Sequence, residues 1–221
     1  IQKLSSGKGP LYEPGLDKLL NAGIESGRLK FNYEPNESLK DTDVLWVAYD
    51  TPVDDEDKAD VQYVLEQIYS VLQFLPKKKT VLVSSQLPVG SIRHLEDFAI
   101  KSLRRVDLSF AYLPENLRLG NALKVFLDPD RIVVGVRDEK ARLSLTELLK
   151  PITERIEWMS VESAEMTKHA LNSFLATSVV FANEIASLCE MIGADAKEVE
   201  RGLKTETRIG SKAYLSPGAA F

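Results

Sequence analysis

The chain has 221 residues, 44% of them hydrophobic, so it can bury the core of one large domain or of one domain and part of a second. Its net charge of −5 at pH 7 gives no electrostatic argument for nucleic acid or an anionic membrane as a partner, and an anionic ligand would need a local basic site. The single cysteine, Cys189, excludes an intrachain disulfide and favours a reducing cytoplasm.

The chain first predicts a helix and then a buried strand. The helix is expected to begin at Pro14, a residue that suits the first helical position, and to end at Gly27. A short extended segment is expected at residues 29–33. The continuous apolar run at residues 43–49 has the length of a strand that is buried on both faces of a parallel sheet.

Helices and strands continue to alternate up to about residue 160. Asp60 can cap the next helix, and the turn Pro88-Val89-Gly90 leads into another. A further helix is expected near residues 138–149. Strands are predicted at residues 80–85, 108–114, 131–136 and 155–159. This alternation favours an α/β fold with a parallel sheet that helices cover on both faces.

The loops after the strands are the places where a ligand is expected. In doubly wound sheets, ligands bind beyond the carboxyl ends of the strands, which here are followed by Thr51-Pro52, residues 84–90 and residues 114–120. The glycine-rich dinucleotide fingerprint G-x-G-x-x-G is absent. Because that fingerprint occupies the first strand–helix turn of such folds, we expect it upstream of Ile1, in a longer protein.

A long helix is predicted from Ser163, a good N-cap, to Gly193, and Asp195 can cap a second helix. Apolar residues surround nearly the whole circumference of the long helix, which is typical of a buried helix. Polar residues interrupt any apolar run of about twenty, so no membrane span is expected.

Two polar side chains of this helix, Lys168 and Asn172, lie four residues apart and therefore on one face. In apolar surroundings a lysine and an amide must be paired with other polar groups or must bind a ligand. The spacing alone fits a Lys–Glu pair with a capped asparagine as well as it fits a ligand site.

Eight segments carry a resemblance to a known family. They are YEPGL (12–16), DTPV (50–53), LPVGS (87–91), PENLRLG (114–120), PDRIVVG (129–135), SAEMTKHALNSFLAT (163–177), NEIASLCE (183–190) and RIG (208–210). In this order, and across nearly the whole chain, they resemble the UDP-glucose/GDP-mannose dehydrogenase family of nucleotide-sugar dehydrogenases.

The resemblance implies a Rossmann-like, doubly wound, mainly parallel NAD-binding domain at residues 1–160, without its first strand and glycine loop. Residues 161–221 would be the central long helix and the start of a helical dimerisation domain. The implied partners are a UDP-sugar and a second copy bound through the 163–193 helix, with no nucleic acid and no membrane. The implied activity, in cytoplasmic polysaccharide biosynthesis, oxidises the sugar C6 alcohol to a carboxylate with two NAD molecules.

The resemblance also implies roles for individual residues. Lys168 would stabilise an alkoxide or oxyanion, Asn172 would hold a water or donate to the same oxygen, and Glu115 would place the substrate and the hydrolysis water. Leu117 and Arg208 would bind substrate, and Arg208 would reach the nucleotide sugar of the partner subunit. Thr51, Pro52, Ser85 and Gln86 would bind the cofactor, and no metal is expected.

The chain departs from the family pattern at two positions. Leu119 stands where a glutamate would face the nicotinamide, and Gln86 replaces a cofactor-side threonine. The nucleophilic cysteine that captures the aldehyde is expected just beyond Phe221, and Cys189, on a packing face, cannot replace it. The chain alone is therefore not expected to complete the oxidation.

Two other interpretations stay open. One is a relative that is non-catalytic or performs a single oxidation, and that acts as a binding or dimerisation module. The other is a two-electron hydroxyacid dehydrogenase of related architecture, which also carries a lysine and an asparagine on its long helix.

Overall fold

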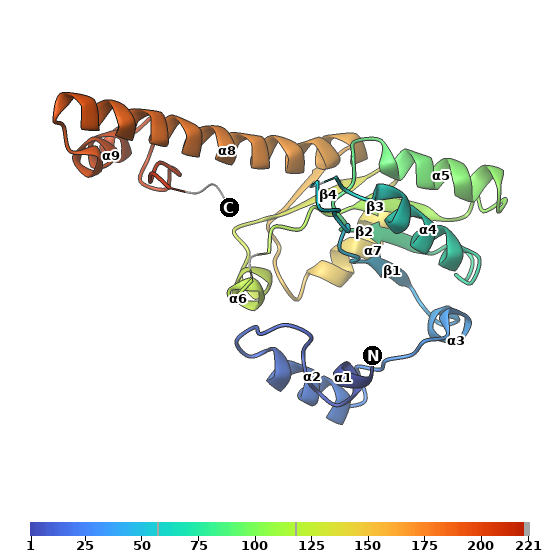
Figure 1. Cartoon of the computed structure of the whole chain (residues 1–221). Helices are drawn as coiled ribbons and strands as arrows, with labels where there is room; N and C mark the ends of the chain where they lie inside the picture. The colour runs from blue at the N-terminus through green and yellow to red at the C-terminus, as the bar shows by residue number, and fades with distance from the viewer. Residues whose placement is uncertain (57, 118, 219–221) are drawn as a thin grey trace. The chain divides into compact units, whose positions relative to one another are not determined.

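The computed structural model describes residues 1–56, 58–117 and 119–218 (Figure 1). The chain divides into two compact units, with the boundary between Met166 and Thr167. The helices are α1 (Gln2–Ser5), α2 (Leu16–Glu25), α3 (Pro35–Leu39), α4 (Val61–Leu72), α5 (Ser91–Lys101), α6 (Ala122–Leu127), α7 (Glu139–Leu149), α8 (Val161–Ile192) and α9 (Ala196–Thr205). The strands are β1 (Val44–Val47), β2 (Thr80–Val83), β3 (Ser109–Tyr112), β4 (Ile132–Val136) and β5 (Ile156–Met159).

The strands form a mixed, mostly parallel sheet in the order β1-β2-β3-β4-β5. The pairs β1–β2, β2–β3 and β4–β5 are parallel. Strands β3 and β4 of this sheet run antiparallel, with Ala111 opposite Val136 and Tyr112 opposite Gly135. The predicted α/β class with a mainly parallel sheet is therefore confirmed.

Alternate residues of each strand point to opposite faces of the sheet, which explains the continuous apolar runs in the sequence. Val81 and Val83 pack with helices α4 and α5 on one face, where Ile68 is fully buried. Leu82 packs on the other face with Leu145 of α7. Figure 1 shows α4 and α5 together on one side of the strands.

Two helix starts in the first unit test the capping predictions. Asp60 caps α4, since its carboxylate accepts a hydrogen bond from the Tyr63 N–H at 3.0 Å, as predicted. The expected start of α2 at Pro14 is wrong. The helix begins at Leu16, because Gly15 has the left-handed φ of +86° that turns the chain into it. Among the described residues, no strand forms at residues 29–33.

Helix α8 begins before the predicted N-cap, Ser163. Ser160 takes that role, since its hydroxyl accepts from the Ser163 N–H at 3.3 Å and its carbonyl accepts from the Ala164 N–H at 3.0 Å. Ser160 and Ser163 are the same residue type, so residue preference alone does not decide which of them is the N-cap. Because β5 ends at Met159 and α8 begins at Val161, Ser160 is the serine that caps the helix.

The prediction that the long helix is buried is wrong for this chain. Large apolar side chains of α8 are exposed, among them Phe174 at 68%, Val180 at 58% and Met191 at 81%. An apolar pattern around a whole helix indicates that all its faces are suited to burial. In this chain, few elements pack against those faces, so they stay exposed. The second unit therefore presents an unusually apolar surface.

By length and composition, α8 also passes the test for a membrane-spanning helix, with a mean hydropathy of 1.4 over its most apolar window, 17% of which is buried. One such helix is weak evidence, because long helices of water-soluble proteins pass the same test. Asn172, Asn183 and Glu184, which interrupt the apolar run, were the reason for expecting no span.

Hydrogen bonds in the second unit cap α9 and tie the segment after α9 back to α8. Asp195 caps α9 as predicted, accepting from the N–H groups of Lys197 at 2.8 Å and Glu198 at 3.4 Å. Asn183 of α8 donates to the Gly218 carbonyl at 2.9 Å and accepts from the Gly218 N–H at 2.8 Å. The segment after α9 is thus tied back to α8.

Candidate functional site

The residues predicted to bind the cofactor come together at the carboxyl ends of β1 and β2. The Thr51 hydroxyl donates to the Gln86 backbone carbonyl at 2.8 Å. The buried Ser85 hydroxyl donates to the Tyr49 carbonyl at 2.7 Å. The Pro52 carbonyl accepts from the N–H of Asp60 at 2.7 Å. The first two bonds join the loops that follow β1 and β2, and the Gln86 residue stays exposed at the sheet edge.

The loop after β3 carries Glu115 and Leu117 and is held at both ends. Near its start, the Glu115 carboxylate accepts a hydrogen bond from the Leu117 N–H. Near its end, Glu13 accepts from the N–H groups of Gly120 at 2.7 Å and Leu123 at 3.2 Å. Glu13 belongs to the YEPGL segment, so a motif more than a hundred residues away in sequence fixes this loop.

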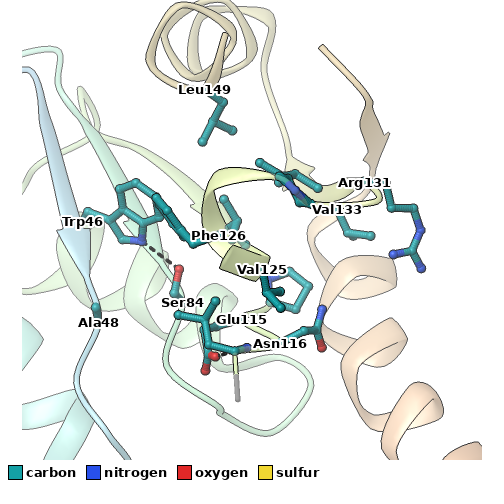
Figure 2. Close-up of a pocket in the computed structure, with 15 residues that line it drawn as sticks. Trp46, Ala48, Ser84, Glu115, Asn116, Val125, Phe126, Arg131, Val133 and Leu149 are labelled. Carbon is teal, nitrogen blue, oxygen red and sulfur yellow. Dashed lines mark hydrogen bonds between the residues drawn. The ribbon is translucent and has the colours of Figure 1, made fainter. Parts of the chain in front are cut away.

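A mostly apolar cavity of about 340 Å³ lies at this edge of the sheet (Figure 2). Glu115 and Asn116 line it together with the rings of Trp46 and Phe126, whose centroids are 6.1 Å apart. The Trp46 indole N–H donates to the Ser84 hydroxyl at 2.7 Å, so both polar groups are satisfied in the apolar wall. Leu117 also lines the cavity. The structure thus places both predicted residues of the 114–120 loop at one site.

Sequence reasoning missed one buried carboxylate, Glu165 of α8. It is 0% exposed, and its two oxygens accept hydrogen bonds from the N–H groups of Gly90 at 2.7 Å and Ile92 at 3.0 Å. These N–H groups open helix α5, where the helix dipole stabilises a negative charge. A signal was present in the sequence, because Glu165 precedes Lys168 by three residues and so shares its helix face.

Tyr112, the last residue of β3, is a second buried polar group near the site. Burial raises the pKa of its phenol to about 12, and the negative charges of Glu165 and Glu115 act in the same direction. The phenol therefore stays protonated and neutral at pH 7.

The remaining predicted residues belong to the second unit. Lys168 and Asn172 lie one turn apart on α8. Arg208 is largely exposed and pairs with Glu206 at 3.0 Å, an interaction that lowers the pKa of the Glu206 carboxyl. Cys189 is buried at 4% exposure, as expected for a residue on a packing face. Thr51, Ser85, Gln86 and Glu115 belong to the first unit.

Two family models cover almost the whole chain. Residues 1–153 match the NAD-binding domain of the UDP-glucose/GDP-mannose dehydrogenase family, and residues 162–221 match its central domain. The chain belongs to this family. The resemblance drawn from the eight segments is thereby confirmed, and NAD is the cofactor of the matched domain.

Individual relatives agree with the family assignment. The UDP-glucose 6-dehydrogenase of Rickettsia bellii is 37% identical over 226 residues, covering 100% of this chain and 51% of that protein. A UDP-glucose dehydrogenase structure from Pyrobaculum islandicum has a TM-score of 0.89 and 34% identity, over 99% of this chain and 51% of its own. A GDP-mannose dehydrogenase structure from Pseudomonas aeruginosa has a TM-score of 0.82 and 30% identity, over 98% and 50%. The chain spans about half the length of the relatives it matches.

The residues at the sheet edge fit a dinucleotide. Ligands of doubly wound sheets bind beyond the carboxyl ends of the strands, where Thr51 and Gln86 lie. The exposed Gln86 carboxamide can donate to one polar group and accept from another, which suits the carboxamide of a nicotinamide. Leu119, predicted to stand at the position of a family glutamate, is 72% exposed, and its side chain offers no polar group.

Proposed function

We propose that the protein of which this chain forms about half is a cytoplasmic NAD-dependent dehydrogenase. It would oxidise the C6 alcohol of a UDP-sugar to the uronic acid, for polysaccharide biosynthesis. The observation that carries the proposal is the edge of the sheet, where the Thr51–Gln86 bond joins the two cofactor loops next to the cavity lined by Glu115. The proposed domains are residues 1–160 for NAD and residues 161–221 for the central helices.

The proposed chemistry assigns each side chain a task. NAD would supply the hydride acceptor, with one molecule needed for each of the two oxidation steps. The Lys168 ammonium would stabilise the negative charge that develops on the sugar oxygen, and Asn172 would donate to that oxygen or hold a water beside it. Glu115, at the cavity, would orient the substrate and the water that hydrolyses the acyl intermediate. Thr51, Pro52, Ser85 and Gln86 would hold the cofactor.

The proposed assembly is a homodimer through the 163–193 helix. The exposed side chains of Phe174, Val180 and Met191 support it, since a surface of this kind marks an interface. Arg208, which pairs with Glu206, would reach the nucleotide sugar bound to the partner subunit. Leu117 would contact the substrate as well. Sedimentation of the full-length protein tests the dimer, and a monodisperse monomer would contradict it.

The activity is tested with the full-length protein, NAD, and UDP-glucose, UDP-N-acetylmannosamine or GDP-mannose in parallel. We expect NADH absorbance with one UDP-sugar and a yield of two NADH per sugar consumed. No NADH with any of the three, together with no rise in Tm on adding them, would overturn the proposal.

A second candidate is a relative that oxidises only once or serves as a non-catalytic module. Leu119 and Gln86 favour it, since a leucine cannot act as a base at the position of the family glutamate and Gln86 stands in place of a cofactor-side threonine. The yield separates the two candidates: one NADH per sugar, with aldehyde released, identifies the single oxidation. A full-length sequence without a cysteine soon after Phe221 would point the same way.

A further inference from the structure

The first turn of helix α8 belongs to the first unit and is packed tightly on its sheet. Gly135 of β4 lies so close that an added Cβ would be 2.7 Å from the Cβ of Ala164 and from the Cα of Val161. Glu162 accepts a hydrogen bond from the Arg137 guanidinium at 2.9 Å. The side chains of this turn therefore extend from a backbone that is fixed to the sheet.

Glu165, one residue further along this helix than Ala164, bonds the backbone at the start of α5. Its two oxygens accept from the N–H groups of Gly90 at 2.7 Å and Ile92 at 3.0 Å, and the whole residue is buried. Gly90 is the N-cap of this 11-residue helix and has a left-handed φ of +96°. The helix offers no carbonyl to its own first N–H groups, so Glu165 supplies the acceptor that they lack. It thereby fixes the turn that leads into α5.

The loop that ends at this turn is held from the other side as well. The Ser85 hydroxyl donates to the Tyr49 carbonyl at 2.7 Å, and the Thr51 hydroxyl donates to the Gln86 carbonyl at 2.8 Å. Leu87, the next residue, is buried in the core of the first unit. The exposed residue Gln86 thus lies between bonds to the loop after β1 and the bonds that Glu165 makes four and six residues later.

We propose that Glu165 is a positioning residue for the cofactor, which holds the loop of residues 84–90 in the geometry that binds NAD by bonding the start of α5. The inference rests on the proposed function, in which Ser85 and Gln86 of this loop hold the cofactor. Because its side chain is fully buried, Glu165 acts through the loop and presents no surface to a ligand.

The expected effect follows from the number of acceptors. Glu165→Gln keeps the shape of the side chain but leaves one acceptor oxygen for two N–H donors, so the turn at Gly90 loses one of its bonds. A loop that is already ordered takes nothing from the binding free energy of its ligand. If the loop keeps its geometry in only about a tenth of the molecules, the apparent Kd for NAD rises about 10-fold.

The test measures NAD binding and loop protection in the full-length protein, without turnover. Calorimetric titration gives the Kd for NAD, and hydrogen exchange read by mass spectrometry follows a peptide that contains Gly90 and Ile92. In Glu165→Gln we expect this peptide to exchange about 10-fold faster before NAD is added, and the Kd for NAD to rise about 3–10-fold. Saturating NAD should restore slow exchange, because ligand binding and loop order are linked. The Kd for UDP-glucose should stay within about twofold.

The matched control is Glu162→Gln, the same change on the preceding turn of α8. The Glu162 carboxylate pairs with the side chains of Arg137 and Arg93, so its loss should lower stability without loosening the loop backbone. We expect the exchange of the Gly90 peptide and the Kd for NAD to stay within about twofold of wild type.

Three results would overturn the inference: unchanged exchange in Glu165→Gln, faster exchange with an unchanged Kd for NAD, or equal effects in Glu162→Gln, which would show a general structural role. Glu165→Asp provides a second variant if Glu165→Gln folds poorly. It keeps the charge, and its shorter reach should raise the Kd for NAD in the same direction. A wild-type protein that binds no NAD overturns the proposed function itself, which is a separate outcome.

Discussion

The Thr51 hydroxyl and the Gln86 backbone carbonyl form a 2.8 Å hydrogen bond between the loops that follow β1 and β2. The bond spans two neighbouring parallel strands at their carboxyl ends. It fixes the backbone from which the exposed Gln86 side chain extends, next to the buried Leu87. A cofactor that contacts Gln86 therefore depends on Thr51 even where it does not touch the threonine.

Replacing Thr51 with valine should weaken NAD binding selectively. Valine keeps the shape of the threonine side chain but removes its hydroxyl donor. Loss of one such hydrogen bond typically costs about 1 kcal/mol, so we expect the KM for NAD to rise about 3–10-fold. We expect the KM for the UDP-sugar to change by less than about twofold, and Thr51→Ser to restore the wild-type value. Steady-state kinetics of the full-length protein gives both constants. An equal rise of both KM values would contradict a role on the cofactor side.

Glu13→Gln should impair catalysis through the loop that carries Glu115. Glu13 accepts from the N–H groups of Gly120 and Leu123, and its amide replacement can satisfy only one of them. We expect kcat/KM for the UDP-sugar to fall about 10-fold. Glu25→Gln, at the exposed end of α2, is the matched control and should have no effect. If both variants behave alike, the loop does not depend on this anchor.

The ion pairs of Glu162 should make the stability of the chain pH-dependent. Hydrogen bonds from Arg137, and then from Arg93, lower the pKa of the Glu162 carboxyl to about 2. Because the folded-state pKa lies below the unfolded value, the stabilisation is present above about pH 4.5 and is lost as the pH falls towards 2. Glu96 acts in the opposite direction, since burial raises its pKa despite Arg137 and its protonation in acid favours the folded state.

Glu162→Gln should therefore lower the free energy of unfolding by about 1–2 kcal/mol at neutral pH, a value reduced for the partial exposure of the pair. The difference from wild type should shrink between about pH 4.5 and pH 3. Urea denaturation at several pH values measures it, with Glu190→Gln on the same helix as the control. A difference that stays constant with pH would exclude the ion pairs as its origin.

Leu119→Glu should cost little stability and should raise activity. At 72% exposure, Leu119 contributes little to a core, so the free energy of unfolding should change by less than about 0.5 kcal/mol. If the missing carboxylate limits the reaction of the full-length protein, kcat should rise severalfold. Leu119→Gln, which adds polarity without a base, should not produce this gain. Equal rates in wild type and both variants would show that position 119 has no part in the chemistry.

Local patterns were sufficient to predict much of the secondary structure. The apolar runs located the strands, and Asp60 and Asp195 were recognised as helix caps because each acts on N–H groups two or three residues away. The start of α8 was missed, since Ser160 and Ser163 are equal candidates until the preceding strand is placed. Capping is predictable to the extent that its partners are local.

Contacts distant in sequence could not be predicted. Glu165 and Gly90 are 75 residues apart, and Glu13 and Gly120 are 107 apart, so no periodicity connects them. The roles of Lys168 and Asn172 came from a resemblance, and spacing alone left an ordinary ion pair equally open. The exposure of α8 was missed for another reason, because an apolar helix surface does not specify whether its partner belongs to the same chain.

The indole of Trp46 gives the cavity an optical reporter of its own. Its N–H is bonded to Ser84 inside the wall, and its ring lies against Phe126, so displacement of either neighbour changes the surroundings of the chromophore. The other tryptophan, Trp158, lies 5.3 Å from the Arg142 guanidinium on a different part of the sheet. With Trp158 replaced by phenylalanine, intrinsic fluorescence would follow events at the carboxyl edge alone, without a label and before any product accumulates.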